Sequence, residues 1–186
     1  MAMYFDFGTR KIIEASAVLL RGEGRRRMAY FRLLKLLYIA DRESLKETGR
    51  PIIGTKPVAM DYGPVHSKVL NLVKGTHYDS PAWAEFITKD GYSIELTGDP
   101  GVLSLSRYEI TKLGEVLERY RDIDDFDLFR ITHDFPEWLR NHREGTSVAI
   151  SLKDIADAVG RGGDLEEILS EAKQEKELDR LLGAAA

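Results

Sequence analysis

The sequence predicts a mainly α (α+β) fold: a compact helical domain with one small antiparallel β-hairpin and a C-terminal helical extension. Most of the 186 residues lie in segments whose apolar side chains recur at helical spacing. One stretch, residues 92–104, instead alternates apolar and polar side chains around a turn. After residue 145, two short helical patterns precede a highly charged run. A chain of this length, 43% hydrophobic, can bury a core without disulfides.

The first helices follow from apolar spacing and capping residues. Thr9 is expected to cap a helix over residues 9–21, and residues 21–27 form a polar connector. Residues 28–47 give the strongest helical pattern, with apolar side chains around most of the circumference. Such a helix is typical of the centre of a domain. Gly49 is expected to end it in the left-handed conformation.

The middle of the chain predicts the β-structure. Residues 56–62 form an extended segment, after which Pro64 at a first helical position opens a helix that ends at Gly75. Residues 92–96 alternate apolar and polar side chains, residues 97–101 have turn chemistry, and residues 102–104 return as the partner strand.

Capping residues mark the starts of the remaining helices. The starts are Ser106 with Glu109, the acidic segment 121–127 before a short helix over 128–132, Pro136, Ser151, and Asp164 with Glu167. The run 171–180 is charged enough to form an exposed helix or to remain partly disordered. The expected organisation is a domain over residues 1–145 followed by a helical extension over residues 146–186.

Composition excludes several classes of protein. The chain has no cysteine, which rules out disulfides, thiol nucleophiles and cysteine-based metal sites. It has neither an apolar run long enough for a membrane span nor a signal-like start, so we expect a cytoplasmic protein with no membrane partner. Residues 1–75 carry 14 basic and 7 acidic side chains, and the remainder 13 and 24, which predicts two electrostatic faces. The pI of about 5.7 makes nucleic-acid binding an unfavoured hypothesis.

Known catalytic motifs are absent, with one partial match. The chain has no phosphate-binding Gly-x-x-x-x-Gly-Lys-Ser/Thr loop and no Gly-x-Ser-x-Gly turn. The dipeptide His133-Asp134 occurs in metal phosphohydrolases inside a helix, and Glu137 and His142 could join His133 around a metal. Pro136 disfavours a continuous helix there. A small metal-dependent hydrolase using His133-Asp134 therefore remains the alternative function.

Four features in order give the chain a family resemblance. They are Lys35-Leu36-Leu37-Tyr38, then Thr48-Gly49-Arg50-Pro51-Ile52, then Tyr62-Gly63-Pro64-Val65, and finally Thr132-His133-Asp134-Phe135-Pro136-Glu137-Trp138. Over roughly residues 8–143 the chain resembles the Panacea domain of SocA-like antitoxins. It departs from the pattern at Glu137-Trp138, where many members have Pro-Trp, and in the extension from residue 146.

The resemblance implies a non-enzymatic protein that binds and neutralises a cognate toxin, and that hands it to a ClpXP-type protease in some members. It implies no catalytic residue, metal or cofactor. We expect the partner-binding residues to be Tyr62, Gly63, Pro64, Val65, His133 and Trp138. The alternative interpretation of these residues is structural, with Tyr62 and Trp138 packed in the core and His133 as a local cap.

The chain ends in Leu181-Leu182-Gly183-Ala184-Ala185-Ala186. Small apolar C-terminal residues resemble the tags that ClpX-type unfoldases recognise, which suggests a degradation signal. The same residues are also typical of a cloning junction. Both interpretations stay open at this stage.

Overall fold

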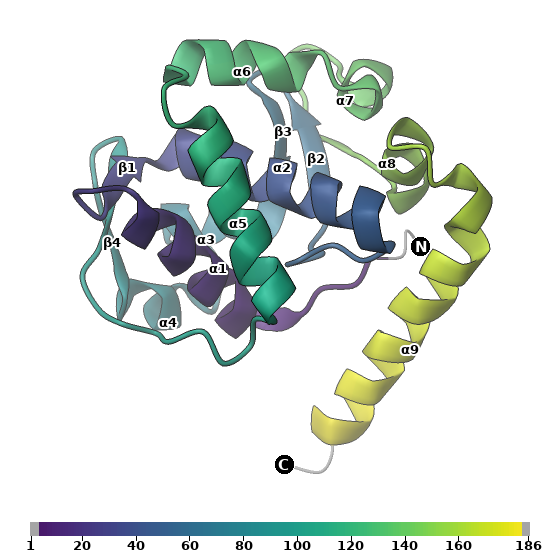
Figure 1. Ribbon diagram of the computed structural model, residues 1–186, viewed down its shortest axis with the longest axis horizontal. Coiled ribbons are helices and arrows are strands. Elements are labelled where there is room, and N and C mark those ends of the chain that lie inside the picture. Colours follow the sequence, from purple (N-terminus) through teal and green to yellow (C-terminus); the bar gives the residue numbers. More distant parts are fainter. Residues whose placement is uncertain (1–3, 184–186) are drawn as a thin grey trace.

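The computed structural model describes residues 4–183 and shows helices packed around two small antiparallel sheets (Figure 1). The longer helices are α1 (Gly8–Gly22), α2 (Tyr30–Thr48), α5 (Arg107–Tyr120) and α9 (Leu165–Gly183). The shorter ones are α3 (Ser67–Lys74), α4 (Ser80–Ala84), α6 (Asp125–His133), α7 (Pro136–Asn141), α8 (Leu152–Ala158) and the 3-10 turn η1 (Gly162–Asp164). The mainly helical α+β fold is thus confirmed.

Helix α2 is the centre of the molecule, as its sequence predicts. Leu33, Leu36 and Leu37 are at most 1% exposed, and α5 crosses α2 in Figure 1. Gly49 ends the helix with a φ of 78°, which confirms the predicted left-handed cap. The helix begins at Tyr30 rather than at Met28, because Met28 pairs with Ile94 in a sheet.

The first sheet has the order β1-β5-β4, from β1 (Arg27–Ala29), β5 (Ser93–Leu96) and β4 (Ile87–Asp90). The predicted hairpin is wrong in its partner strand: β5 pairs with β4, and residues 102–104 contain no strand. Asp90 pairs with Ser93 across a two-residue loop in which Gly91 has a φ of 57°. Such a loop suits the twist of a hairpin. The other edge of β5 is filled by β1.

The second sheet has the order β3-β2-β6, from β3 (Gly63–His66), β2 (Pro57–Met60) and β6 (Val148–Ala149). The helix predicted to open at Pro64 is therefore wrong at its start, since α3 begins at Ser67. Pro64 lies on an edge strand, where its missing N–H costs no ladder hydrogen bond. The sequence thus holds two sheets where one hairpin was expected.

Local capping chemistry sets most helix starts. The capping boxes of Ser106 with Glu109 and of Ser151 are present, and Asp124 caps α6. Thr9 does not cap α1: the helix begins one residue earlier, and the Thr9 hydroxyl donates to Asp79 instead. Asp164 ends the 3-10 turn directly before α9, where the sequence predicts a helix start, and its carboxylate pairs with Arg161 at 2.8 Å.

The residues after 145 pack against the N-terminal part of the chain. Strand β6 extends the second sheet, and Ile155, Ile168 and Ala172 share an apolar cluster with Leu45 and Trp138. Beyond this cluster the charged end of α9 runs away from the body (Figure 1). The charged run is therefore helical as far as Gly183, and Ala184, Ala185 and Ala186 lie outside the described residues.

Candidate partner-binding site

The turn between β2 and β3 carries Tyr62 at the surface. Its side chain is 66% exposed, and its ring centroid lies 5.7 Å from that of Phe129 and 6.4 Å from that of Phe31. The next residue, Gly63, has a φ of 87°. A Cβ there would lie 2.8 Å from both Lys35 Nζ and Thr132 Oγ1. Only glycine lets this turn lie so close to α2 and α6.

The two following residues face inward. Val65 is 5% exposed and belongs to the main core. Pro64 is buried as well, and its carbonyl accepts a hydrogen bond of 3.0 Å from Lys35 Nζ. These two residues therefore hold the hairpin in place, and within the Tyr62-Gly63-Pro64-Val65 motif only Tyr62 presents its side chain outward.

His133 and Trp138 form part of a stack of rings beside the turn. The imidazole of His133 lies between the rings of Phe129 and Trp138, with both centroid separations 4.0 Å. His142 stacks on the far side of Trp138 at 4.4 Å. The Trp138 indole N–H donates to the Met60 carbonyl at 2.9 Å, which ties the stack to β2. Burial and the nearby charge of Lys35 lower the pKa of His133, so its neutral form is favoured.

Trp138 is 7% exposed and His133 half-buried, so the stack supports the turn from behind. Of the six residues singled out from the sequence, the structure brings all to one corner, between the second sheet, α6 and α7. Only Tyr62 is broadly exposed there. The other five residues are buried or half-buried and hold the exposed turn in position.

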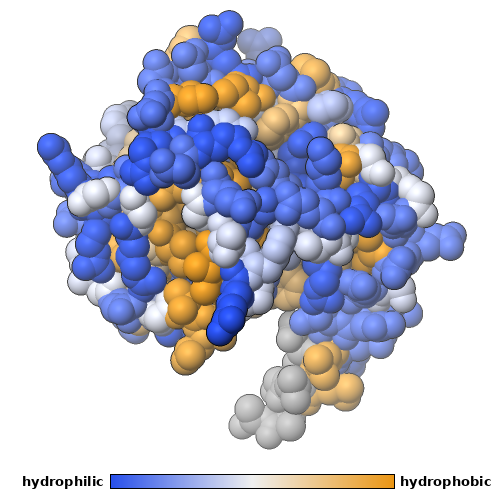
Figure 2. Space-filling model, in the orientation of Figure 1, coloured by the Kyte–Doolittle hydropathy of each residue, from blue (hydrophilic) through white to orange (hydrophobic). Residues whose placement is uncertain are grey.

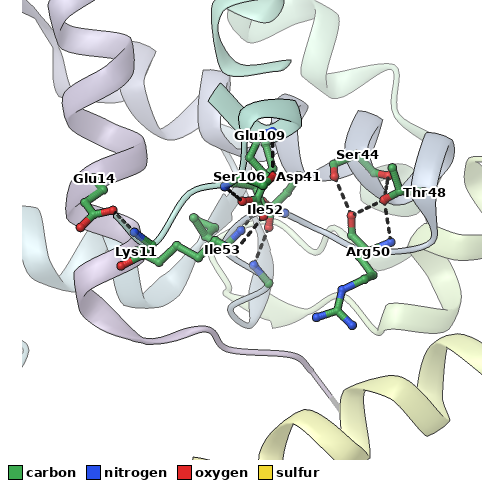
Figure 3. A network of polar contacts seen from close by, with 12 residues as sticks. Lys11, Glu14, Asp41, Ser44, Thr48, Arg50, Ile52, Ile53, Ser106 and Glu109 are labelled. Carbon is green, nitrogen blue, oxygen red and sulfur yellow. Dashed lines mark hydrogen bonds and ion pairs between the residues drawn. The ribbon is translucent and has the colours of Figure 1, made fainter. Parts of the chain in front are cut away.

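A buried carboxylate, that of Asp41, holds the loop after α2, which contains the second of the four sequence motifs. Asp41 accepts hydrogen bonds from the backbone N–H groups of Ile52, Ile53 and Gly54 at 2.8–2.9 Å (Figure 3). Its second neighbour is His66, whose Nε2 lies 3.3 Å from the carboxylate. Burial raises the pKa of Asp41, while His66 and the three N–H groups oppose that effect. The Thr48-Gly49-Arg50-Pro51-Ile52 segment is thus anchored to the central helix.

An aromatic groove opens beside Tyr62. It has a volume of about 590 Å³. Its lining includes six aromatic rings: Tyr30, Phe31, Tyr62, Tyr92, Phe126 and Phe129. Phe126 is 69% and Tyr92 75% exposed, which is unusual for large rings gathered in one place. Hydrophobic side chains are visible among charged ones along α6 in Figure 2. Basic side chains of α2, Arg32 and Lys35, also line the groove.

Sequence reasoning missed this groove. Its residues come from β1, α2, the β2–β3 turn, the β4–β5 loop and α6, which the fold alone brings together. The available signal was local: Tyr92 lies at a hairpin turn, and Phe126 lies in an otherwise acidic segment. Large exposed rings become unusual only where they gather in one patch, and that gathering depends on the fold.

The alternative metal site does not assemble. Helix α6 ends at His133, as Pro136 predicted. Glu137 turns inward to the Tyr38 hydroxyl and to Arg42, at 3.0 and 2.8 Å. His142 instead pairs with Asp61 at 2.9 Å. Across residues 4–183, no three His, Asp or Glu side chains are grouped so that they could hold a metal ion.

Among the described helices, none is both long enough and apolar enough to cross a lipid bilayer.

Comparison with known proteins assigns the chain to a family. The family model of the SocA-like antitoxins, Panacea domain, matches residues 33–139, more than half of the chain. No curated protein and no solved structure matched. The matched segment runs from the central helix to the ring stack and contains Tyr62, the Asp41-anchored loop and Trp138. The chain belongs to the SocA-like antitoxin family that is defined by the Panacea domain.

Proposed function

We propose that this protein is an antitoxin that neutralises a cognate protein toxin by direct binding at the aromatic groove. The observation that carries the proposal is the group of exposed rings around Tyr62, inside the matched family domain. Exposed aromatic side chains at one concave place are characteristic of binding hot spots, because they bury much area at low entropic cost.

The proposed mechanism is masking of a toxin surface without chemistry. Tyr62, Phe126 and Tyr92 contact the toxin. Gly63, Pro64 and Val65 hold the hairpin against α2, and His133 and Trp138 support the turn from behind. No step in this mechanism uses a metal, a nucleotide or another cofactor.

The organisation that we propose places this activity in residues 1–145, with residues 146–186 as a helical extension. A protease-adaptor role would add a second partner of the ClpXP type. It is favoured by α9, whose charged end leaves the body of the protein and is open to contact with a second protein (Figure 1).

The experiment starts from the open reading frame that adjoins the gene for this protein. Its product should be toxic when expressed alone, harmless when co-expressed, and should co-purify with the antitoxin at a fixed stoichiometry. Addition of EDTA to the purified complex should leave it intact. A neutralisation that requires a divalent ion, or that persists when the two proteins do not associate, would contradict the proposal.

A further inference from the structure

Lys35 is a buried cation with few partners. Its side chain lies on α2 beneath the Tyr62 turn and is 3% exposed. An ammonium group has three N–H donors. Among the described residues, Lys35 Nζ has one hydrogen-bond acceptor, the Pro64 carbonyl, and no carboxylate oxygen within 4.0 Å. His133, which lies with Lys35 Nζ around Gly63, is another base rather than a counter-charge.

Other buried cations of the chain are paired. Lys112, 5% exposed, lies 2.6–3.8 Å from carboxylates of Glu43, Glu47 and Glu115. Arg32, one turn before Lys35, donates to three backbone carbonyls and to Asp125. The fold therefore supplies several acceptors to both Lys112 and Arg32, whereas Lys35, which lines the aromatic groove with Arg32, has a single one.

From this juxtaposition we infer that the groove receives a segment of the toxin in which an acidic side chain lies between apolar or aromatic residues, and that Lys35 binds that carboxylate. The inference rests on the proposed function and specifies the chemistry of the partner. The groove is lined by aromatic rings for the apolar residues and by Lys35, whose Nζ has one hydrogen-bond acceptor, for the acid.

The lining of the groove favours an acidic partner over a basic one. Its charged members are Arg32, Lys35 and Asp125, and the single carboxylate is already held by Arg32 at 3.1 Å. An acidic side chain from within a segment fits better than a chain terminus, because a flexible stem can reach a lining residue that is almost wholly buried. Its flanking residues then cover the exposed rings of Tyr62, Tyr92 and Phe126.

The first experiment uses the toxin complex and a double-mutant cycle. The dissociation constant is measured for wild type and Lys35→Met, each against toxin variants in which single Asp or Glu residues are changed to the amide. Lys35→Met should weaken binding at least about tenfold, the scale of a charge-assisted hydrogen bond. One toxin substitution should weaken wild type equally and have no further effect on Lys35→Met. Lys112→Met, a buried lysine outside the groove, should bind normally.

The second experiment needs no toxin. The peptide acetyl-Ala-Phe-Glu-Phe-Ala-amide and its Gln counterpart are titrated into the full chain, with binding followed by chemical-shift changes of the groove aromatics. The Glu peptide should bind about tenfold more tightly, and Lys35→Met should abolish the difference while Lys112→Met keeps it. A third peptide, the Gln sequence with a free C-terminal carboxylate, tests a chain terminus as the source of the charge.

Equal binding of the Glu and Gln peptides overturns the inference, as does preference for the free C-terminus. An unchanged toxin affinity of Lys35→Met also overturns the inference. The proposed antitoxin function would stand in that case, because the complex with the toxin still forms. If no toxin binds the protein, the proposed function is refuted, and the inference about the toxin segment is refuted with it.

Discussion

Replacing Lys35 by methionine should stabilise the protein, although the side chain is in its core. Burial lowers the pKa of Lys35 from 10.5 to about 7. Each pKa unit corresponds to 1.36 kcal/mol, so keeping this lysine charged in the folded state costs about 5 kcal/mol. Methionine has a similar unbranched shape and no charge, but it leaves the Pro64 carbonyl unpaired, at a cost of roughly 1–3 kcal/mol. The net gain at pH 7 is about 2–4 kcal/mol.

The pH dependence has a definite sign. Between pH 7 and 10.5 the unfolded chain keeps the Lys35 proton that the folded chain releases, so the stability of wild type rises with pH across this window. The cost is fully present below pH 7 and disappears above 10.5. The advantage of Lys35→Met should therefore shrink by about 3 kcal/mol between pH 7 and pH 9.5.

Urea unfolding at both pH values, with fluorescence and circular dichroism as probes, measures the effect. Lys112→Met is the matched control: burial alone would lower the pKa of Lys112, but hydrogen bonds with Glu115 and Glu47 outweigh this and raise it above its usual range. That variant should be destabilised, by the same amount at pH 7 and pH 9.5. If Lys35→Met is destabilised at pH 7, or if its difference from wild type is independent of pH, the reasoning about Lys35 is wrong.

Further predictions concern the core, the turn and the tail. Leu37→Asp places an unpaired charge at a position that is 1% exposed and should cost about 4 kcal/mol or more, so the variant should be insoluble or lack a cooperative melt; a melt near wild type would show that α2 is not central. Gly63→Ala combines a left-handed φ with a 2.8 Å approach to Lys35 Nζ and should lose roughly 2–3 kcal/mol in urea unfolding, whereas Gly75→Ala, with a similar φ and free space, should lose about 1. Equal losses would remove the close-packing argument. Replacing Ala185 and Ala186 by Asp should lengthen the half-life in cells if the tail is a degradation signal, and an unchanged half-life would refute that role.

The sequence was informative where a single local cause decides the structure. The helix expected over residues 28–47 from its apolar circumference, the left-handed Gly49 and the Ser106 capping box each depend on one or two turns of chain, and each is present, with the helix starting two residues later than predicted. The family resemblance also rested on contiguous motifs, and the match over residues 33–139 confirms it.

The prediction errors arose where one local pattern fits two structures and tertiary contacts decide between them. Pro64 suits both a helix start and an edge strand, and the pairing of β2 with β3 decides for the strand. The turn chemistry of residues 97–101 is real, but Gly91 closes a tighter hairpin and β1 takes the remaining edge. The groove could not be predicted, because no periodicity relates Phe31, Tyr62, Tyr92 and Phe126 along the chain.

The central claim is that the rings of the groove form the toxin interface, and one affinity measurement tests it most directly. The dissociation constant of the toxin is compared for wild type, for the double variant Tyr62→Ala with Phe126→Ala, and for Tyr78→Ala, an 81% exposed tyrosine outside the groove. Hot-spot truncations cost roughly 2 kcal/mol or more each, so the double variant should bind at least a hundredfold more weakly while Tyr78→Ala binds as wild type does. Unchanged affinity of the double variant, with its fold intact by circular dichroism, would contradict the account.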